Sequence, residues 1–239
     1  MSMELDELRR DLALANRIAH AAGLVTAFGH ISARIGPDAF LFPTRASPAL
    51  ADPNRLLVLD LEGNRRSGEG EPNTEFWIHA RIYAARPDVQ AVAHVHSPAC
   101  VALGQIGIPL LPLHNHGGMF ADGVPLFEPV GLIRSRQLGD HVAATLGDHR
   151  AMFLRGHGAN VAEVNVRRAA VVACFLEEAA DLQLRALAAS GGRLEALRVF
   201  TTDETELLGE QLDASGPMNR AWEYYAALVE GRVLRNGGS

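Results

Sequence analysis

The chain has 239 residues, 48% of them hydrophobic and 21% charged, with a formal net charge of −6. This composition is typical of a globular protein that buries a substantial core, and the lack of a basic patch with interleaved aromatic residues argues against a nucleic-acid partner. No stretch approaches about 18 uninterrupted apolar residues, which argues against a membrane-spanning helix.

The start of the chain and its two cysteines indicate a compartment. Residues 1–17 are charged and helical in pattern, unlike the basic stub and apolar run of a secretory signal. Cys100 and Cys174 lie in apolar stretches and show no CxxC spacing, which suits two buried thiols in a reducing environment. We therefore expect a cytoplasmic protein.

Predicted helices and strands alternate along the chain. Apolar spacing, caps and breakers predict helices over 5–19, from Asn73 or Thr74 to about 85, from Ser97, over 132–146, over 166–189 and over 222–229. Strands are predicted over 39–42, 56–61, 90–96, 151–154 and 160–162. No linker or repeat interrupts this order, so we expect one α/β domain over 1–239, with a central sheet covered by helices on both faces. No Gly-rich phosphate loop follows a strand, which argues against a nucleotide cofactor.

Two histidines lie two residues apart in the strand predicted over 90–96. Because side chains alternate along a strand, His94 and His96 share one face and could bind one metal ion together. Chance alternation, with each imidazole hydrogen-bonded in the core, is the other interpretation of this pair.

A third histidine favours the metal. His157 lies between two glycines at a predicted strand-to-strand turn, where the backbone can bend tightly. Three neutral imidazoles would leave open positions on a divalent ion, as in catalytic sites. Zn²⁺ is expected first, and Mn²⁺, Fe²⁺ or Co²⁺ would accept the same ligands. Glu75 begins a helix upstream of the strand, where a negative charge is favourable in itself, but beside three histidines it is a candidate fourth ligand or general base.

A second histidine pair, His114 and His116, lies in a loop flanked by Pro112 and two glycines. These side chains are metal ligands, proton-transfer groups or exposed loop residues, and the sequence leaves the three alternatives open. His79 and the other histidines on predicted helices or surface turns are assigned no role.

Four segments in a fixed order resemble the class II aldolase/adducin family, over about residues 5–190. They are TAFGHISAR, FPTRASP, EPNTEFWIHARIYAARPDVQAVAHVHS and RGHGANV. The resemblance implies an α/β/α sandwich with a mostly antiparallel sheet, assembled as a homotetramer with sites near subunit interfaces. It also implies a metal on His94, His96 and His157, with Glu75 as ligand or acid/base. Because all four residues are kept, a non-catalytic, adducin-like binding module is the less favoured member type.

The chain departs from the sugar-phosphate aldolases of this family in motifs that cradle a phosphate there. It has His30 where they carry Asn, Arg45 where they carry Gly, and an Asn-Thr pair where they carry Ser-Ser. The planar guanidinium of Arg45 suits a carboxylate, although an exposed surface arginine is the alternative. The side chains expected to contact the substrate are His30, Thr44, Arg45, Asn73 and Thr74.

These departures favour a carbon–carbon lyase that decarboxylates a hydroxy- or keto-substituted carboxylic acid, aromatic acids included. The aldolases use a tyrosine after an Ile-Pro pair as proton donor, and no tyrosine follows Ile108-Pro109 here, so Glu75 or His116 would protonate the carbon. The alternative is an aldolase that cleaves a sugar phosphate or another hydroxy-ketone, with epimerisation and dehydration ranked below it. Both reactions need the same metal-stabilised enolate.

Overall fold

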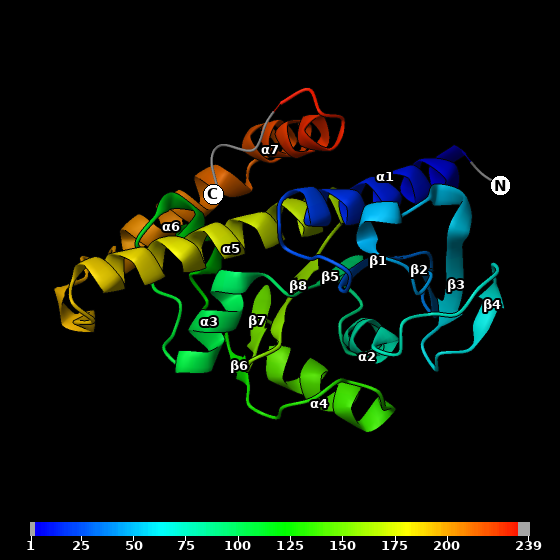
Figure 1. Cartoon of the computed structure of the whole chain (residues 1–239), viewed down its shortest axis with the longest axis horizontal. Coiled ribbons are helices and arrows are strands. Elements are labelled where there is room, and N and C mark those ends of the chain that lie inside the picture. The colour runs from blue at the N-terminus through cyan, green and yellow to red at the C-terminus, as the bar shows by residue number, and fades with distance from the viewer. Residues whose placement is uncertain (1–2, 234–239) are drawn as a thin grey trace.

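The computed structural model describes residues 3–233 and contains one eight-stranded sheet packed between helices (Figure 1). The strands are β1 (His30–Arg34), β2 (Ala39–Pro43), β3 (Leu56–Asp60), β4 (Arg65–Ser67), β5 (Ala91–Val95), β6 (Leu126–Phe127), β7 (Ala151–Leu154) and β8 (Gly158–Glu163). The α-helices are α1 (Met3–Ala21), α2 (Phe76–Ala85), α3 (Pro98–Ile106), α4 (Arg136–Leu146), α5 (Val166–Ala189), α6 (Thr202–Asp213) and α7 (Ser215–Val229). The ends of the expected domain, 1–2 and 234–239, lie outside the described residues.

The sheet order is β4-β3-β2-β1-β5-β8-β7-β6. Every neighbouring pair is antiparallel except β6 and β7, which are parallel. This confirms the expected α/β class with a mostly antiparallel sheet. Helices α1, α3 and α5 contact one face of the sheet, and α2 and α4 contact the other (Figure 1). No helix within residues 3–233 is both long and apolar enough to cross a bilayer.

Strand alternation divides the core into two layers and decides where β5 presents its histidines. Ala91, Ala93 and Val95 belong to the hydrophobic cluster under α1, α3 and α5. Val92 belongs to the cluster under α2 and α4. Because side chains alternate across a strand, His94 shares the face of Val92, toward α2. The apolar residues of β5 therefore fix the direction in which the imidazole points.

Several elements differ from the predictions. The N-cap of α2 is Glu75 rather than Asn73 or Thr74, and its side chain makes no capping bond because its carboxylate turns toward other groups. Helix α4 begins after Ser135, whose hydroxyl caps it, and α7 begins at Ser215, earlier than expected. Sequence reasoning missed β1, the short edge strands β4 and β6, and α6.

Candidate metal centre and its cavity

Three histidines and one glutamate converge where α2 meets the centre of the sheet. Glu75 comes from the N-cap of α2, His94 from β5, His96 from just after β5, and His157 from the β7–β8 turn. One ligand-type atom from each lies within 4.8 Å of the other three. The Nε2 atoms of His94 and His96 are 2.9 Å apart. Glu75 Oε2 lies 3.8 Å from His94 Nε2 and 3.7 Å from His157 Nε2.

The β7–β8 turn reaches this place because Gly158 has no side chain. A Cβ at Gly158 would lie 2.0 Å from the carbonyl oxygen of Val95, far inside van der Waals contact. Gly156 has a φ of +64°, in the left-handed region that favours glycine. The main-chain N–H of His157 then closes the turn by donating to the Leu154 carbonyl at 3.0 Å. The two glycines thus let the turn press against the end of β5, which brings His157 to the histidine pair.

Hydrogen bonds orient two of the converging side chains. Oδ1 of Asn160 lies 2.8 Å from Nδ1 of His94, so the Nδ1 proton donates to the amide and Nε2 is left bare toward the cluster. The main-chain N–H of Ile133 donates to Oε1 of Glu75 at 2.9 Å. The second carboxylate oxygen therefore remains available to the imidazoles. Both arrangements are typical of residues that support a metal.

Burial keeps the imidazoles of the β5 pair neutral. It lowers the pKa of His94 well below its usual value, and the neighbouring imidazoles lower it further. Burial, followed by the nearby His157, lowers the pKa of His96 to about 4. Neutral imidazole is the form that binds a metal.

The donor set and its spacing fit a divalent cation. Nε2 of His157 is buried and has no hydrogen-bond partner among the described residues. A Zn²⁺ ion with ligands at about 2.0–2.1 Å places tetrahedral neighbours about 3.4 Å apart. Three of the separations here are 2.9, 3.7 and 3.8 Å, and all lie within 4.8 Å. Three nitrogens and one carboxylate oxygen suit the zinc, manganese, iron and cobalt ions alike.

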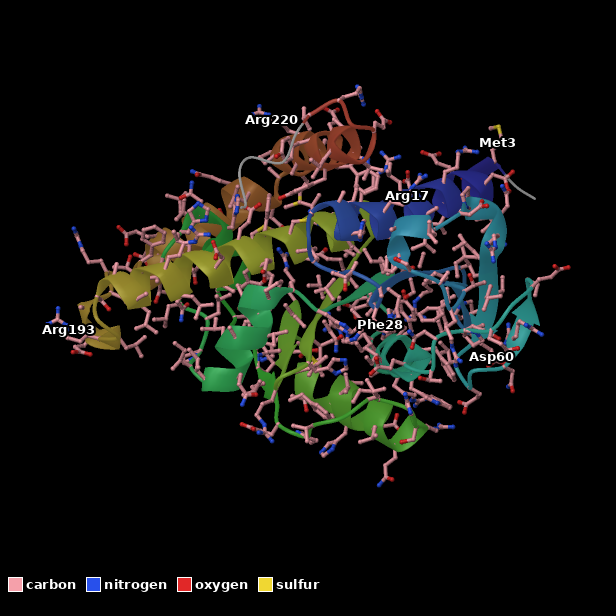
Figure 2. All side chains as sticks on the ribbon, viewed as in Figure 1. Met3, Arg17, Phe28, Asp60, Arg193 and Arg220 are labelled. Atoms are coloured by element: carbon pink, nitrogen blue, oxygen red, sulfur yellow. The ribbon has the colours of Figure 1, made fainter. Side chains whose placement is uncertain are left out.

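A cavity of about 670 Å³ opens beside the cluster. Phe28, one of its lining residues, is labelled near the middle of the molecule in Figure 2. Glu75, His96 and His157 line the cavity as well. The structure also places every predicted substrate contact in its wall, namely His30, Thr44, Arg45, Asn73 and Thr74.

Two further arginines in the cavity wall were missed by the sequence analysis. Arg55 ends a short helical turn directly before β3, and Arg134 lies in the loop before α4. Within the described part of the chain, neither they nor Arg45 pair with a carboxylate. Unpaired guanidinium groups around one cavity suit an anionic ligand. Arginines in loops carry no periodic signal, which is why the sequence did not single them out.

His116 lies elsewhere. Its Nδ1 is 2.8 Å from Oε2 of Glu178, and its ring stacks on Phe175 with centroids 3.9 Å apart. His114 is adjacent, with ring centroids 4.6 Å apart. Neither histidine lines the cavity of its own chain, so the proton-donor role of His116 stays a prediction.

Comparison with known proteins identifies the family. The model of the Class II Aldolase and Adducin N-terminal domain matches residues 10–184. The chain belongs to the class II aldolase and adducin family.

Class II aldolase relatives of two activities resemble this chain. A 3,4-dihydroxyphthalate decarboxylase of Arthrobacter keyseri is 32% identical, over 92% of this chain and 93% of its own. An L-fuculose phosphate aldolase of Escherichia coli O157:H7 is 27% identical, over 79% of this chain and 85% of its own. The crystal structure of an aldolase II superfamily protein from Pseudomonas syringae superposes with a TM-score of 0.85 at 28% identity, covering 97% of this chain and 95% of that one. Decarboxylases and aldolases are both lyases, and the His/Glu cluster fits the metal that class II aldolases require. This class II aldolase family member is therefore a metal-dependent lyase.

Proposed function

We propose that the chain decarboxylates a hydroxy-substituted aromatic dicarboxylate. The observation that carries the proposal is the position of three unpaired arginines in the same cavity as the His/Glu cluster. One carboxylate leaves as CO₂, a proton takes its place on the ring carbon, and the second carboxylate needs a cationic partner throughout. The higher identity to the dihydroxyphthalate decarboxylase than to the fuculose phosphate aldolase supports the same choice.

In this proposal, some cavity residues bind the metal and others bind the substrate. His94, His96 and His157 would hold a divalent ion, for which Zn²⁺ is the first candidate, with Glu75 either as a fourth ligand or as the acid/base. Bound there, the ion supplies Lewis-acid stabilisation of the negative charge that develops on a substrate oxygen as CO₂ departs. Arg45, with His30, orients the carboxylate that stays on the ring, where a guanidinium can make two parallel hydrogen bonds. Thr44, Asn73 and Thr74 offer further hydrogen bonds from the wall.

Proton delivery to the ring carbon has two candidates. Glu75 is buried and its Oε2 faces the histidine cluster, so in the acid/base role, as the alternative to binding the ion, it would deliver the proton. His116 could do so only from a neighbouring copy, because it does not line the cavity of its own chain. Unchanged turnover in His116→Ala would remove that histidine from consideration as the proton donor.

The homotetramer and the cytoplasmic location are further parts of the proposal, and light scattering of the purified protein tests the homotetramer.

The decisive experiment measures CO₂ release from 3,4-dihydroxyphthalate and a panel of hydroxy-substituted dicarboxylates, with Mn²⁺ or Zn²⁺ added. We expect release that depends on the metal and on both substrate carboxylates. Cleavage of fuculose phosphate without any CO₂ release would instead support the aldolase alternative, which the 27% identity to an aldolase favours. A chain that is purified without metal and takes up none on titration would be a binding module rather than an enzyme.

A further inference from the structure

Four side chains that the proposed reaction does not use as a set form a hydrogen-bond network leading away from the cavity. His30 Nδ1 lies 2.7 Å from His79 Nε2, and His79 Nδ1 lies 2.6 Å from the Ser32 hydroxyl. The Ser32 hydroxyl lies 2.7 Å from that of Tyr83. His30 and Ser32 share a face of β1, and His79 and Tyr83 lie one turn apart on α2. All four residues are buried, and His30 alone lines the cavity.

Tyr83, at the end of this network farthest from the cavity, sets the direction of every hydrogen bond in it. A buried phenol proton without an acceptor would be costly, and the nearby Arg34 guanidinium, 4.8 Å from the Tyr83 ring centroid, can only donate. Among the described residues, only Ser32 offers the phenol an acceptor. Tyr83 therefore donates its proton to the Ser32 oxygen.

The remaining protons then follow in sequence. Ser32 has one proton, and leaving it without an acceptor in the core would be costly, so it donates to His79 Nδ1. A neutral His79 must then carry its own proton on Nε2, which donates to His30 Nδ1. A neutral His30 is left with its proton on Nε2.

We infer that Tyr83, Ser32 and His79 fix His30 as a neutral imidazole whose Nε2–H donates a hydrogen bond to an anionic substrate oxygen in the cavity. Nε2 of His30 is buried and has no partner within the described part of the chain. The rings of His30 and His94 lie 5.1 Å apart, so this donor sits beside the cluster. Because a protonated nitrogen cannot coordinate a metal, His30 is a substrate contact and not a fourth imidazole ligand. The identity of the acceptor as a carboxylate rests on the proposed function; the direction of the hydrogen bonds does not.

The tautomers can be read directly by nitrogen-15 NMR of the full chain labelled at its histidine nitrogens, with the His30 signals assigned by their loss in His30→Asn. We expect both His30 and His79 to be protonated on Nε2 and bare on Nδ1. A proton on His30 Nδ1 would overturn the inference. Tyr83→Phe removes the hydroxyl that sets the direction, so His30 should become a mixture of both tautomers in that variant. An unchanged His30 would show that Tyr83 does not control it.

A matched control separates this effect from the general loss of a buried hydroxyl. The Tyr225 hydroxyl is also part of a mostly buried side chain and donates to Glu178 at 2.8 Å. Tyr225→Phe should leave the His30 tautomer as it is in the wild type. A mixture in this variant too would mean that the tautomer responds to altered packing, which would count against the inference.

Phthalate, which has two carboxylates and no hydroxyl, tests the ligand class without any reaction. Its Kd should rise about two- to tenfold in Tyr83→Phe, since only the fraction of protein with the right tautomer binds well. Metal affinity in His30→Asn should stay within about twofold of the wild type, and a large loss would make His30 a ligand. Correct tautomers with no CO₂ release from any dicarboxylate would reject the proposed reaction and keep this inference. Correct tautomers with equal phthalate binding in all variants would reject the carboxylate acceptor.

Discussion

His94 and Asn160 are register partners across β5 and β8, and the Asn160 side-chain oxygen lies 2.8 Å from His94 Nδ1. The amide therefore holds the His94 ring with Nε2 bare and directed at Glu75, His96 and His157. Side chains that orient a ligand in this way contribute to metal affinity without touching the metal.

Replacing Asn160 by leucine should weaken metal binding by about 10- to 100-fold. Without the acceptor, the His94 proton is free to move to Nε2, and the ring is free to turn. Competition with a chromophoric chelator measures the affinity. Asn160→Asp keeps an acceptor at the same place and should retain most of it. If the leucine variant binds as tightly as the wild type, the amide does not set the His94 tautomer.

Gly158→Ala should damage both stability and the metal centre. The new Cβ would lie 2.0 Å from the Val95 carbonyl oxygen, so the β7–β8 turn must move and carry His157 away from β5. Overpacking of this kind costs about 1–3 kcal/mol of unfolding free energy. Urea unfolding and metal titration measure the two effects. Gly216→Ala in α7 is the control, because nothing lies within 4 Å of its added Cβ, and it should be as stable as the wild type or more stable by up to about 1 kcal/mol.

Arg45→Gly should raise KM for a dicarboxylate by about 10- to 100-fold, since a charge-assisted hydrogen bond contributes about 1.5–3 kcal/mol. Arg45→Lys keeps the charge but loses the planar fork, so its KM should lie between those of the wild type and Arg45→Gly. Arg185→Ala, at an exposed i,i+4 pair with Asp181, should leave KM unchanged. Sugar-phosphate turnover that survives or rises in Arg45→Gly would contradict the carboxylate-binding role.

The buried His79 should make stability depend on pH on the acid side. Burial lowers its pKa well below the usual 6.5, so the unfolded chain takes up a proton near pH 6.5 that the folded chain does not. Its contribution is complete above about pH 6.5 and is lost as the pH falls below that value, by up to about 1.4 kcal/mol per pH unit. The curve of unfolding free energy against pH, from 7.5 to 5.5, should be shallower by about that amount in His79→Gln. Parallel curves for the two proteins would rule out this contribution.

The sequence predicted the parts of the site that depend on local pattern. The HxH spacing in a β-strand and the Gly-His-Gly turn each describe a local geometry, and the resemblance joined them to Glu75. The sequence could not predict the features that depend on contacts across the sheet. His79 lies on an apolar helix with nothing nearby in sequence to mark its bond to His30, and Asn160 gains its role only through the pairing of β5 with β8.

The secondary structure shows the same difference between features set by local sequence pattern and features set by contacts across the sheet. Strands with apolar runs, such as β5 and β7, were predicted nearly to the residue, whereas β1 was missed because His30, Ser32 and Arg34 interrupt its apolar positions. These polar residues face α2, where they are hydrogen-bonded rather than solvated. Helix α6 was missed because its sequence is mostly polar, and its capping box at Thr201 and Glu204 went unrecognised.

The origin of the four converging groups has a mechanical consequence. They come from the start of α2, the end of β5 and the β7–β8 turn, so a cation among them would act as a cross-link between segments that are distant in the chain. Without it, desolvated nitrogen and oxygen atoms in the middle of the sheet would lack compensation. Removal of the cation by a chelator and heating should therefore both disrupt the interior of the sheet before its edges.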